Sequence, residues 1–332
     1  MTRTDHGHRH LERIAQVRAG DVPAKVRYPI RVRETRVVRT TMVGSGLLRL
    51  TLGGSGVEGF ESHSPIDHVK LIFPEPDGSL RLPEPDGDLL RWPRPAPTSR
   101  EYTVRRHDPV AGEIDIDIAP HPGGLASDWA QEVAPGAVAH VAGPPGGLIV
   151  PPVYDRYLLV GDITALPAVA CWLEQLPRDA RGWAFVEVAD ATEEIPLAAP
   201  EGMEVRWLHR GARPAGTGGL LERSVTTIAV PEGERLYAWI AGEAGQIKPL
   251  RRWIRDVLRL PRSDHEISGY WKRGVADFDD EHDHPPDDHV PQEHAPDGRA
   301  PHGRHKHEHA PDDRAPHGRH EHKHEHHDDH RH

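Results

Sequence analysis

The chain has 332 residues, with 41 Lys and Arg against 52 Asp and Glu, 26 His and one Cys. Most of the net charge of -11 comes from residues 275–332, which hold 16 acids, 7 bases and 16 histidines, so the rest of the chain is nearly neutral. The single cysteine excludes an intrachain disulfide, the neutral part argues against non-specific nucleic-acid binding, and no run approaches the roughly 20 apolar residues of a membrane span. Because the first residues also lack the apolar core of a signal peptide, we expect a cytoplasmic protein.

The chain up to residue 150 is dominated by short strands separated by turns. Residues 1–26 are expected to form a flexible arm with a short helix near residues 11–18. β-Branched or alternating runs predict strands at residues 31–41, 47–52, 68–73, 101–105, 113–118 and 137–142. Many short strands over about 120 residues indicate a small antiparallel barrel, which we place at residues 27–150.

Two segments within residues 27–150 carry further information. PEPDG occurs twice in residues 74–87, which predicts a hairpin or loop insertion. In residues 113–118 isoleucine alternates with acids, which predicts a strand with one exposed face.

From residue 151 to residue 274, buried strands alternate with helices. Apolar runs predict strands at residues 157–160, 183–188, 205–208 and 236–241, and helical spacing predicts helices at residues 166–176 and 248–260. This alternation is typical of a parallel sheet covered by helices. The expected fold class is therefore a β-barrel followed by an α/β domain, with a separate C-terminal tail.

The string SREYTVR, residues 99–105, combines groups that suit a flat cofactor with a diphosphate. On a strand, Arg100 and Tyr102 face the same way, so a guanidinium for phosphate lies near a flat ring. Thr103 adds a hydroxyl and a backbone N–H. An ordinary exposed strand with charged flanks is the alternative interpretation.

Two glycine-containing turns that open helices are candidate nucleotide sites. GGLASDWA, residues 123–130, leaves backbone N–H groups free at a helix start, which suits pyrophosphate, although a plain helix cap explains it equally well. GDITALPA, residues 161–168, follows a parallel strand, and Pro167 fits the first turn of the next helix. Ligands of such folds bind at the carboxyl ends of the strands, where this loop must lie.

In this order and spacing, SREYTVR, GLASDWA, GPPGG, GDITALPA, WIAGEAGQIKPLRRW and SGYWKRG resemble the siderophore-interacting protein family of flavin-dependent ferric-siderophore reductases. The resemblance covers roughly residues 27–274. It implies a fold like that of ferredoxin–NADP reductase, with an FAD-binding barrel at residues 27–150 and an NAD(P)H-binding α/β domain at residues 151–274.

The resemblance assigns roles to individual residues. Arg100 would bind the FAD diphosphate, Tyr102 would pack on the isoalloxazine, and Thr103 would lie near the reactive flavin edge. The other residues that it places at FAD are Arg105, Gly124, Ala126, Ser127 and Trp129. Those that it places at the nicotinamide dinucleotide are Asp162, Thr164, Ala165, Leu166, Gly242 and Glu243.

The candidate residues for binding the substrate are three basic ones, Lys70, Lys272 and Arg273, which would face an anionic iron complex. Ordinary surface charge is the alternative interpretation. Tyr270 and Trp271 pack either near the flavin or in the core. The chain also departs from the family pattern twice. The stretch Ala119-Pro120-His121-Pro122 stands where the family has His-Gly, so either His121 takes over that contact by a one-residue shift or the contact is lost. Asp128 stands where a basic residue is common, which leaves the type of iron complex open.

The implied reaction is electron transfer. A hydride would pass from NAD(P)H to FAD, and single electrons would then reduce Fe(III) held by a siderophore, so that the more weakly held Fe(II) is released. No protein residue is expected to act as a general base. A small redox protein is an alternative electron donor, and Arg210 and Arg213 are candidates for holding a 2′-phosphate.

Residues 275–332 have few apolar side chains and are expected to be disordered. They contain a 15-residue repeat, residues 294–308 and 309–323, with 12 identical positions. Spaced imidazoles bind Ni²⁺, Zn²⁺ or Cu²⁺, and released Fe²⁺ is a further candidate. The candidate ligands are His305, His307, His309, His320, His322, His324, His326 and His327. Two alternative functions follow: a metal-binding or metal-buffering protein in which the tail is the functional part, or a flavin reductase of another metal complex.

Overall fold

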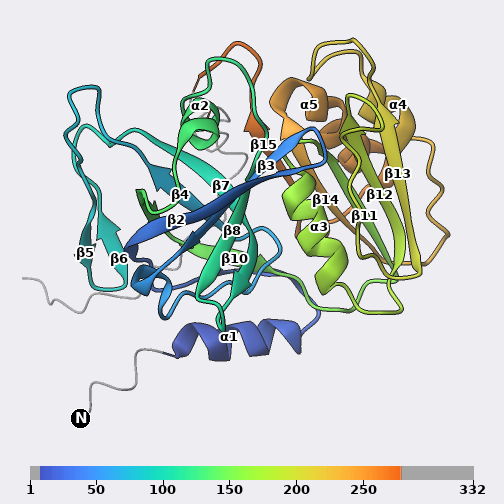
Figure 1. Cartoon of the computed structure of the whole chain (residues 1–332). Helices are drawn as coiled ribbons and strands as arrows, with labels where there is room; N and C mark the ends of the chain where they lie inside the picture. The colour runs from blue at the N-terminus through green and yellow to red at the C-terminus, as the bar shows by residue number, and fades with distance from the viewer. Residues whose placement is uncertain (1–7, 277, 279–332) are drawn as a thin grey trace, which may run out of the picture. The chain divides into compact units, whose positions relative to one another are not determined.

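The computed structural model describes residues 8–276 and residue 278, all within one compact unit. In this unit a closed antiparallel barrel is followed by a parallel sheet with helices on both faces (Figure 1). The expected fold class is confirmed for these residues. The candidate metal ligands of the His-rich tail, and the predicted disorder of that tail, lie outside the described part of the chain.

The barrel has the strand order β2-β3-β8-β7-β4-β9, with every neighbouring pair antiparallel. Its strands are β2 (Val32–Val43), β3 (Leu47–Gly53), β4 (His68–Ile72), β7 (Ser99–Asp108), β8 (Glu113–Ile118) and β9 (Val138–Ala142). Between β4 and β7 the predicted hairpin insertion is confirmed as β5 (Glu84–Asp86) and β6 (Leu89–Arg91). Helix α2 (Leu125–Glu132) connects β8 to β9, and a short 3₁₀ turn, η1 (Ser55–Val57), follows β3.

The prediction that β8 exposes one face is wrong. Asp115 and Asp117 are 2% and 5% exposed, although they alternate with the isoleucines of the barrel core. Asp117 accepts two hydrogen bonds from Arg49, at 2.7 and 2.8 Å, and Asp115 accepts one from Arg106 Nε at 2.7 Å. The arginines cover the carboxylates and neutralise their charge. The alternating pattern of β8 therefore belongs to a strand whose two faces are both covered.

Residues 8–26 also differ from the flexible arm expected for residues 1–26. Helix α1 (Arg9–Arg18) packs Ile14 and Val17 against Tyr28, and β1 (Ala24–Arg27) pairs with β10 (Gly146–Ile149). Helical spacing of apolar residues brings these side chains onto one face of α1, which explains why the segment is ordered against the barrel.

The second domain is a parallel sheet with the order β13-β12-β11-β14-β15. Its strands are β11 (Arg156–Asp162), β12 (Arg181–Val188), β13 (Gly202–His209), β14 (Leu236–Glu243) and β15 (His265–Trp271). Its helices are α3 (Leu166–Gln175), α4 (Leu220–Val225) and α5 (Ala244–Arg252), which continues as a π-helical turn, η2 (Trp253–Leu258), before the 3₁₀ turn η3 (Arg262–Asp264). The order reverses between β11 and β14, and ligands of doubly wound sheets bind at such a reversal.

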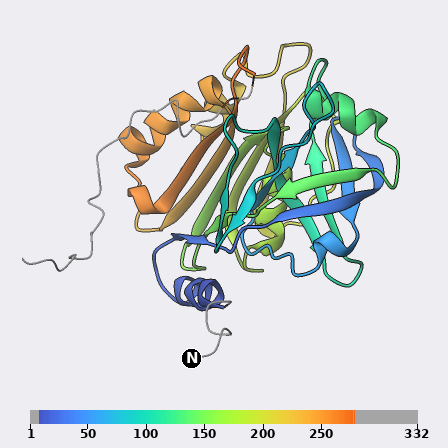
Figure 2. The same ribbon diagram turned by 90° about the vertical axis from the view of Figure 1, so that its left-hand side faces the viewer.

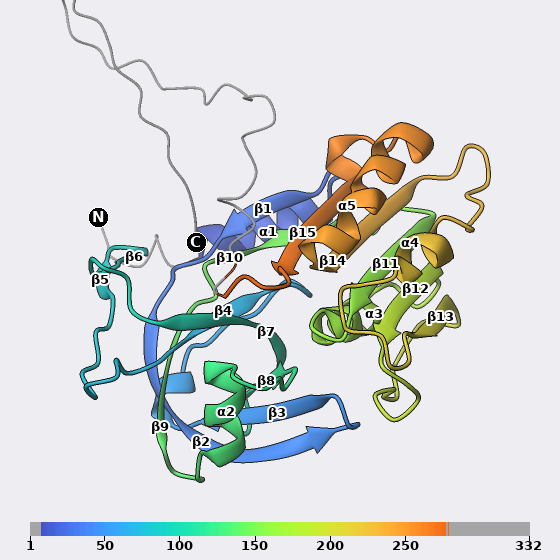
Figure 3. The same ribbon diagram turned by 90° about the horizontal axis from the view of Figure 1, so that it is seen from above.

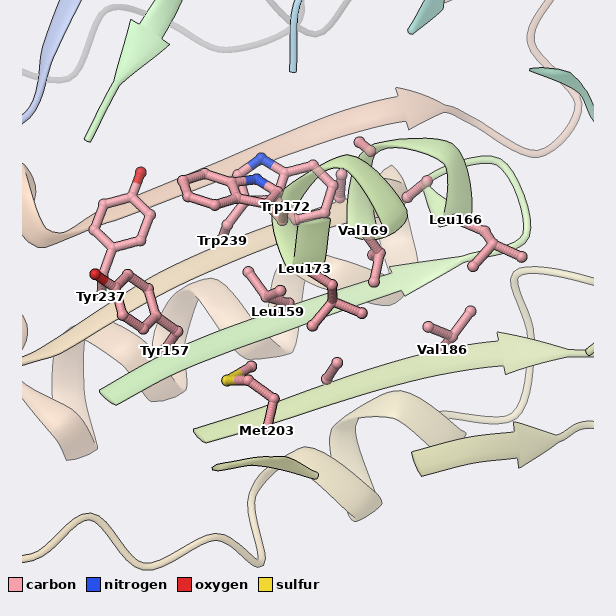
Figure 4. Close-up of a cluster of buried hydrophobic side chains, with 14 of the residues drawn as sticks. Tyr157, Leu159, Leu166, Val169, Trp172, Leu173, Val186, Met203, Tyr237 and Trp239 are labelled. Atoms are coloured by element: carbon pink, nitrogen blue, oxygen red, sulfur yellow. The ribbon is translucent and has the colours of Figure 1, made fainter. Parts of the chain in front are cut away.

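The two faces of the sheet have separate cores. On one face, α3 packs Val169, Trp172 and Leu173 over residues of the strands such as Leu159 and Trp239 (Figure 4). Helices α4 and α5 cover the other face, and α5 runs along the outside of the sheet (Figures 2 and 3). Helix α3 also contacts β7 of the barrel, so the same helix links the two domains.

Candidate functional site

Asp162 is the hub of the carboxyl edge of the parallel sheet. The carboxylate ends β11 and is 4% exposed. Its Oδ1 accepts hydrogen bonds from Thr164 N at 2.9 Å and Thr164 Oγ1 at 2.5 Å. Its Oδ2 accepts from Glu243 N, at the end of β14, at 2.9 Å and from Trp271 Nε1, at the end of β15, at 2.8 Å. One side chain therefore holds three strand ends together at the reversal of strand order.

Glu243 continues this network into helix α5. Its Oε2 caps the helix by accepting from Gln246 N at 2.7 Å, and its Oε1 accepts from Arg273 N at 3.1 Å. Gly242 lets the backbone of β14 approach the Asp162 carboxylate, because its φ is +147° and an added Cβ would lie 2.8 Å from Asp162 Oδ2. Asp162, Thr164, Gly242 and Glu243 lie together at the sheet edge, where the Asp162 carboxylate accepts hydrogen bonds from Thr164 and from Glu243 N.

A buried pair beside this hub had no signal in the sequence. Glu187, at the end of β12, is 1% exposed and accepts a 2.5 Å hydrogen bond from Gln246 Nε2. Burial raises the pKa of Glu187, and the charge of Asp162 raises it further, against the lowering effect of the Gln246 bond. Gln246 Oε1 is buried and has no hydrogen-bond partner among the described residues. When Glu187 is ionised it cannot donate a hydrogen bond, so Gln246 Oε1 is left without a donor.

Replacing Glu187 with glutamine is expected to stabilise the protein at neutral pH. A carboxyl whose pKa is raised by folding lowers the free energy of unfolding as the pH rises from its unfolded-state pKa through its folded-state pKa. The reason is that the native state must then give up a proton that it holds more tightly. The introduced amide keeps the accepting oxygen and can also donate to Gln246 Oε1. We expect a gain of about 1 kcal/mol at pH 8 that vanishes toward pH 4.5, measured by urea unfolding across pH.

Glu204→Gln is the matched control for that experiment. Glu204 lies on β13, where its hydrogen bond with Arg206 lowers the pKa of the carboxyl. Glu204→Gln should therefore shift the pH dependence of the free energy of unfolding in the opposite direction. Parallel pH curves for Glu187→Gln and the wild type would contradict the assignment of a raised pKa to Glu187.

Strand β7 meets the sheet edge through Thr103 and Tyr270. Thr103 is 7% exposed, and its side chain lies beside the phenol of Tyr270 on β15, whose pKa it lowers against the larger raising effect of burial. The Tyr270 ring also packs edge-on against Trp239 of β14, with centroids 6.3 Å apart. Tyr102, next to Thr103, is half-buried against the barrel core, and burial raises the pKa of its phenol to about 12. Strand β7, which carries the SREYTVR motif, therefore lies at the edge of the parallel sheet where β11, β14 and β15 end.

Arg105 makes an ion pair between the two domains. A bulge between Val104 and Arg106 makes Arg105 the extra residue of β7. Its guanidinium forms a bidentate pair with Glu174 of α3, at 2.6 and 3.0 Å. Cys171, one turn earlier on α3, donates to the Arg105 carbonyl oxygen at 3.4 Å, and burial raises the pKa of this thiol to about 12. The cysteine is therefore a protonated packing residue at the domain contact.

The start of helix α2 leaves its backbone donors without a side-chain cap. The N-cap is Gly124, and no side chain of the described residues caps the helix there. Ser127 is 2% exposed, and its hydroxyl accepts from His121 N at 2.9 Å. The His121 ring lies against Gly124, so close that an added Cβ would be 2.4 Å from Cε1. His121 thus contacts the GGLASDWA segment, although the His-Gly pair is missing, and Asp128 lies exposed on the first turn of α2.

Several of the other assigned residues have little exposed side chain. Ala165 and Leu166, at the start of α3, are fully buried, and Ala126 is 3% exposed, so a ligand would meet only their backbone. Trp129 packs edge-on against Phe73, with ring centroids 5.6 Å apart. Arg100 is half-buried and donates to the Ser99 carbonyl oxygen at 2.7 Å.

The three candidate substrate residues come from two segments of the chain. Lys70, on β4, pairs with Glu101 Oε1 at 2.7 Å and lies over the Trp92 ring. Lys272 and Arg273 directly follow β15, and Lys272 lies over the Phe278 ring at 5.6 Å. Lys70 is thus opposed by an acid of the neighbouring strand, whereas Arg273 is tied by its backbone to Glu243.

A pocket of about 330 Å³ lies beyond the carboxyl ends of β12 and β13. His209, Arg210 and Arg213 line it. Arg210 faces Glu193 at 3.7 Å, and His209 pairs with Glu194 at 2.6 Å. Arg213 brings positive charge to the same pocket from the following loop.

A closed antiparallel barrel followed by a parallel sheet defines a two-domain fold like that of solved ferredoxin reductases. Comparison with family models makes the assignment specific. Residues 36–148 match the siderophore-interacting FAD-binding domain, and residues 154–274 match the siderophore-interacting protein model. The chain belongs to the siderophore-interacting protein family, as the motifs indicated.

Individual relatives agree with this assignment. The chain is 36% identical over 245 residues to the ferric vibriobactin reductase ViuB of Vibrio cholerae, covering 71% of this chain and 88% of the relative. It is 35% identical over 234 residues to the NADPH-dependent ferric-chelate reductase of Escherichia coli, covering 69% and 89%. The crystal structure of a siderophore utilization protein from T. fusca superposes with a TM-score of 0.73 at 40% identity, covering 78% of this chain and 99% of the other. None of the helices in the described part of the chain has the length and apolar character of a membrane span.

Proposed function

We propose that this protein is a flavin-dependent reductase that passes electrons from NAD(P)H through FAD to ferric siderophores. The observation that carries the proposal is the junction of Thr103 and Tyr270, which joins the barrel strand to the sheet edge organised by Asp162. Such a junction would place a flat cofactor on the barrel next to a dinucleotide on the sheet. The relatives named as ferric reductases support the same substrate class.

The residues present fit FAD at this junction. The uncapped amides at Gly124 suit a pyrophosphate, and the half-buried Tyr102 ring offers a flat apolar surface. FAD, when bound, would accept a hydride from the nicotinamide and pass single electrons to Fe(III), two ferric ions for each NAD(P)H. The protein's own part is to hold both groups and to exclude side reactions; Lys70, Lys272 and Arg273 would attract the anionic complex.

For the electron donor we propose NADPH. The pocket beyond β12 and β13 carries Arg210 and Arg213, and the Glu193 contact occupies only part of the Arg210 guanidinium. Guanidinium groups suit a 2′-phosphate, which NADH lacks. The Escherichia coli relative is named for NADPH. Arg213→Ala should raise the KM for NADPH about tenfold and leave that for NADH unchanged; an equal change in both would contradict the donor assignment.

The visible absorption spectrum of the chelator-stripped protein tests the main proposal. Flavin bands should bleach anaerobically on adding NADPH and should return on adding a ferric siderophore. A colourless protein that cannot be reconstituted with FAD would rule out the reductase. Bleaching without recovery across a panel of ferric siderophores would favour a flavin reductase of another metal complex.

For the tail we propose divalent-metal binding by residues 275–332, on the strength of its 16 histidines. Nickel, zinc, copper or the released ferrous iron are the candidate ions. Deleting the tail should lower the bound metal per chain, measured by elemental analysis after equilibration, and should leave the flavin spectrum unchanged. A metal-buffering protein, in which the tail is the functional part, would lose its cellular effect with this deletion while keeping reductase activity.

A further inference from the structure

Three potential metal ligands meet where the N-terminal helix lies against the barrel. His10, in the first turn of α1, directs Nε2 at Glu61 Oε2, 2.7 Å away. His63 directs its own Nε2 at the same oxygen, 3.2 Å away. The three ligand atoms lie within 4.8 Å of one another, and no other such group occurs in the described parts of the chain. We name His10, Glu61 and His63 the His-Glu-His cluster.

The spacing of these atoms is close to that around a bound zinc ion. Zinc lies about 2.0–2.2 Å from nitrogen and oxygen ligands, so the ligand atoms of a tetrahedral site are about 3.4 Å apart. Small outward movements of the side chains therefore make room for an ion between the two imidazoles and the carboxylate. Two imidazoles and one carboxylate are a ligand set that zinc and similar divalent ions accept.

The surroundings hold the His-Glu-His cluster in place. Asp67, which is 1% exposed, accepts from His63 N at 2.6 Å and from Tyr28 OH at 3.3 Å. Arg18 of α1 donates to the His63 carbonyl oxygen at 3.0 Å. The Tyr28 ring contacts the rings of both His10 and His63, with centroids 5.8 and 5.2 Å away. The loop and the helix thus present the ligands from fixed backbone positions, which lowers the entropy cost of binding.

Burial decreases from one side of the His-Glu-His cluster to the other. The His10 side chain is 6% exposed, that of His63 is 20% exposed, and that of Glu61 is 44% exposed. An ion can therefore enter from the Glu61 side, where a water molecule can complete the coordination. His10 Nδ1 is buried without a partner among the described residues, so Nε2 is the nitrogen of this imidazole that faces the carboxylate.

We propose that the His-Glu-His cluster is a binding site for a divalent transition-metal ion of the zinc type, which fastens helix α1 to the barrel. None of its residues belongs to the His-rich tail or to the junction of β7 with the parallel sheet. Helix α1 is otherwise attached chiefly through Ile14 and Val17, so a metal bridge at His10 would secure its first turn. The proposal does not depend on the reductase assignment.

Hydrogen exchange of the full-length, chelator-stripped protein tests this site separately from the tail. Zinc should slow amide exchange in residues 9–18 and in the loop around Glu61 and His63 by tenfold or more, because an ion that binds only the closed state suppresses local opening. His63→Gln and Glu61→Gln should abolish the protection. Zinc held by the tail would be unchanged in these variants, so the difference reports on the His-Glu-His cluster.

His209→Gln is the matched control, because His209 makes a similar 2.6 Å pair with Glu194 on the far domain; it should keep the zinc effect. Absence of protection in the wild type, or equal protection in His63→Gln, would overturn the proposal. Anomalous scattering at the zinc edge gives a second reading. A peak within about 2.3 Å of Nε2 of both His10 and His63 is expected, and a zinc-soaked crystal without that peak would also overturn it.

Discussion

Asp162→Ala is expected to destabilise the protein by about 3 kcal/mol or more, because several buried donors lose their acceptor together. The carboxylate accepts from Thr164, from Glu243 N and from Trp271 Nε1. Without it, the ends of β11, β14 and β15 lose their common anchor. Urea unfolding measures the loss, and anaerobic stopped-flow bleaching should show hydride transfer at least tenfold slower while the barrel keeps its flavin.

Asp190→Ala is a matched control within the same domain. Asp190 lies in the loop after β12 in a similar turn, accepting from Thr192 N at 2.8 Å and from Thr192 Oγ1 at 2.7 Å. It is exposed and holds no neighbouring strand, so its loss should lower the free energy of unfolding far less than the loss of Asp162. Equal losses for the two variants would show that Asp162 only shapes its own turn.

Asp162→Asn separates charge from geometry. The amide keeps one accepting oxygen, but its NH₂ group must face donors on the other side, which hydrogen bonding cannot satisfy. We expect a stability between those of the wild type and Asp162→Ala. An unchanged rate of bleaching in Asp162→Asn would show that the carboxylate does not position the strand ends for hydride transfer.

The sequence pattern was sufficient to predict the order of the barrel and the parallel sheet and the six barrel strands, but it predicted no strand at β1 or β10. Apolar runs such as residues 157–160 are buried on both sides of the parallel sheet, and their length distinguishes them from helices. The β8 prediction failed because local alternation does not reveal a distant arginine. Arg49 reaches Asp117 across 68 positions and turns an acidic face into a covered one.

The candidate site could be predicted where a motif constrains the local backbone. It could not be predicted where contacts between residues distant in the sequence position the side chains. Asp162 and Glu243 come together because both end parallel strands, and such ends meet at one edge. The Glu187–Gln246 pair lacked any signal, because 59 positions separate its members. Arg105 shares its motif with Arg100, yet a bulge directs it to Glu174 of the other domain. The His-Glu-His cluster likewise combines positions 51 residues apart.

Tyr102→Ala is expected to weaken FAD binding by about 10- to 100-fold, as removal of a stacking ring commonly costs about 1–3 kcal/mol. The ring is half-buried against the barrel core, so its position is fixed before a cofactor arrives. Titration of the apoprotein with FAD, followed by the change in flavin fluorescence, measures the dissociation constant.

Tyr102→Phe distinguishes the ring from its hydroxyl. The pKa of the phenol is raised to about 12 by burial, so the hydroxyl is neutral at any working pH and supplies no charge to the flavin. Phenylalanine keeps the flat surface, and the dissociation constant should change by less than about threefold. If Tyr102→Phe lost FAD as completely as Tyr102→Ala, a hydrogen bond from the hydroxyl would hold the cofactor in place of stacking. If neither variant changed binding, the flavin would lie on another face of the barrel, away from the junction of Thr103 with Tyr270.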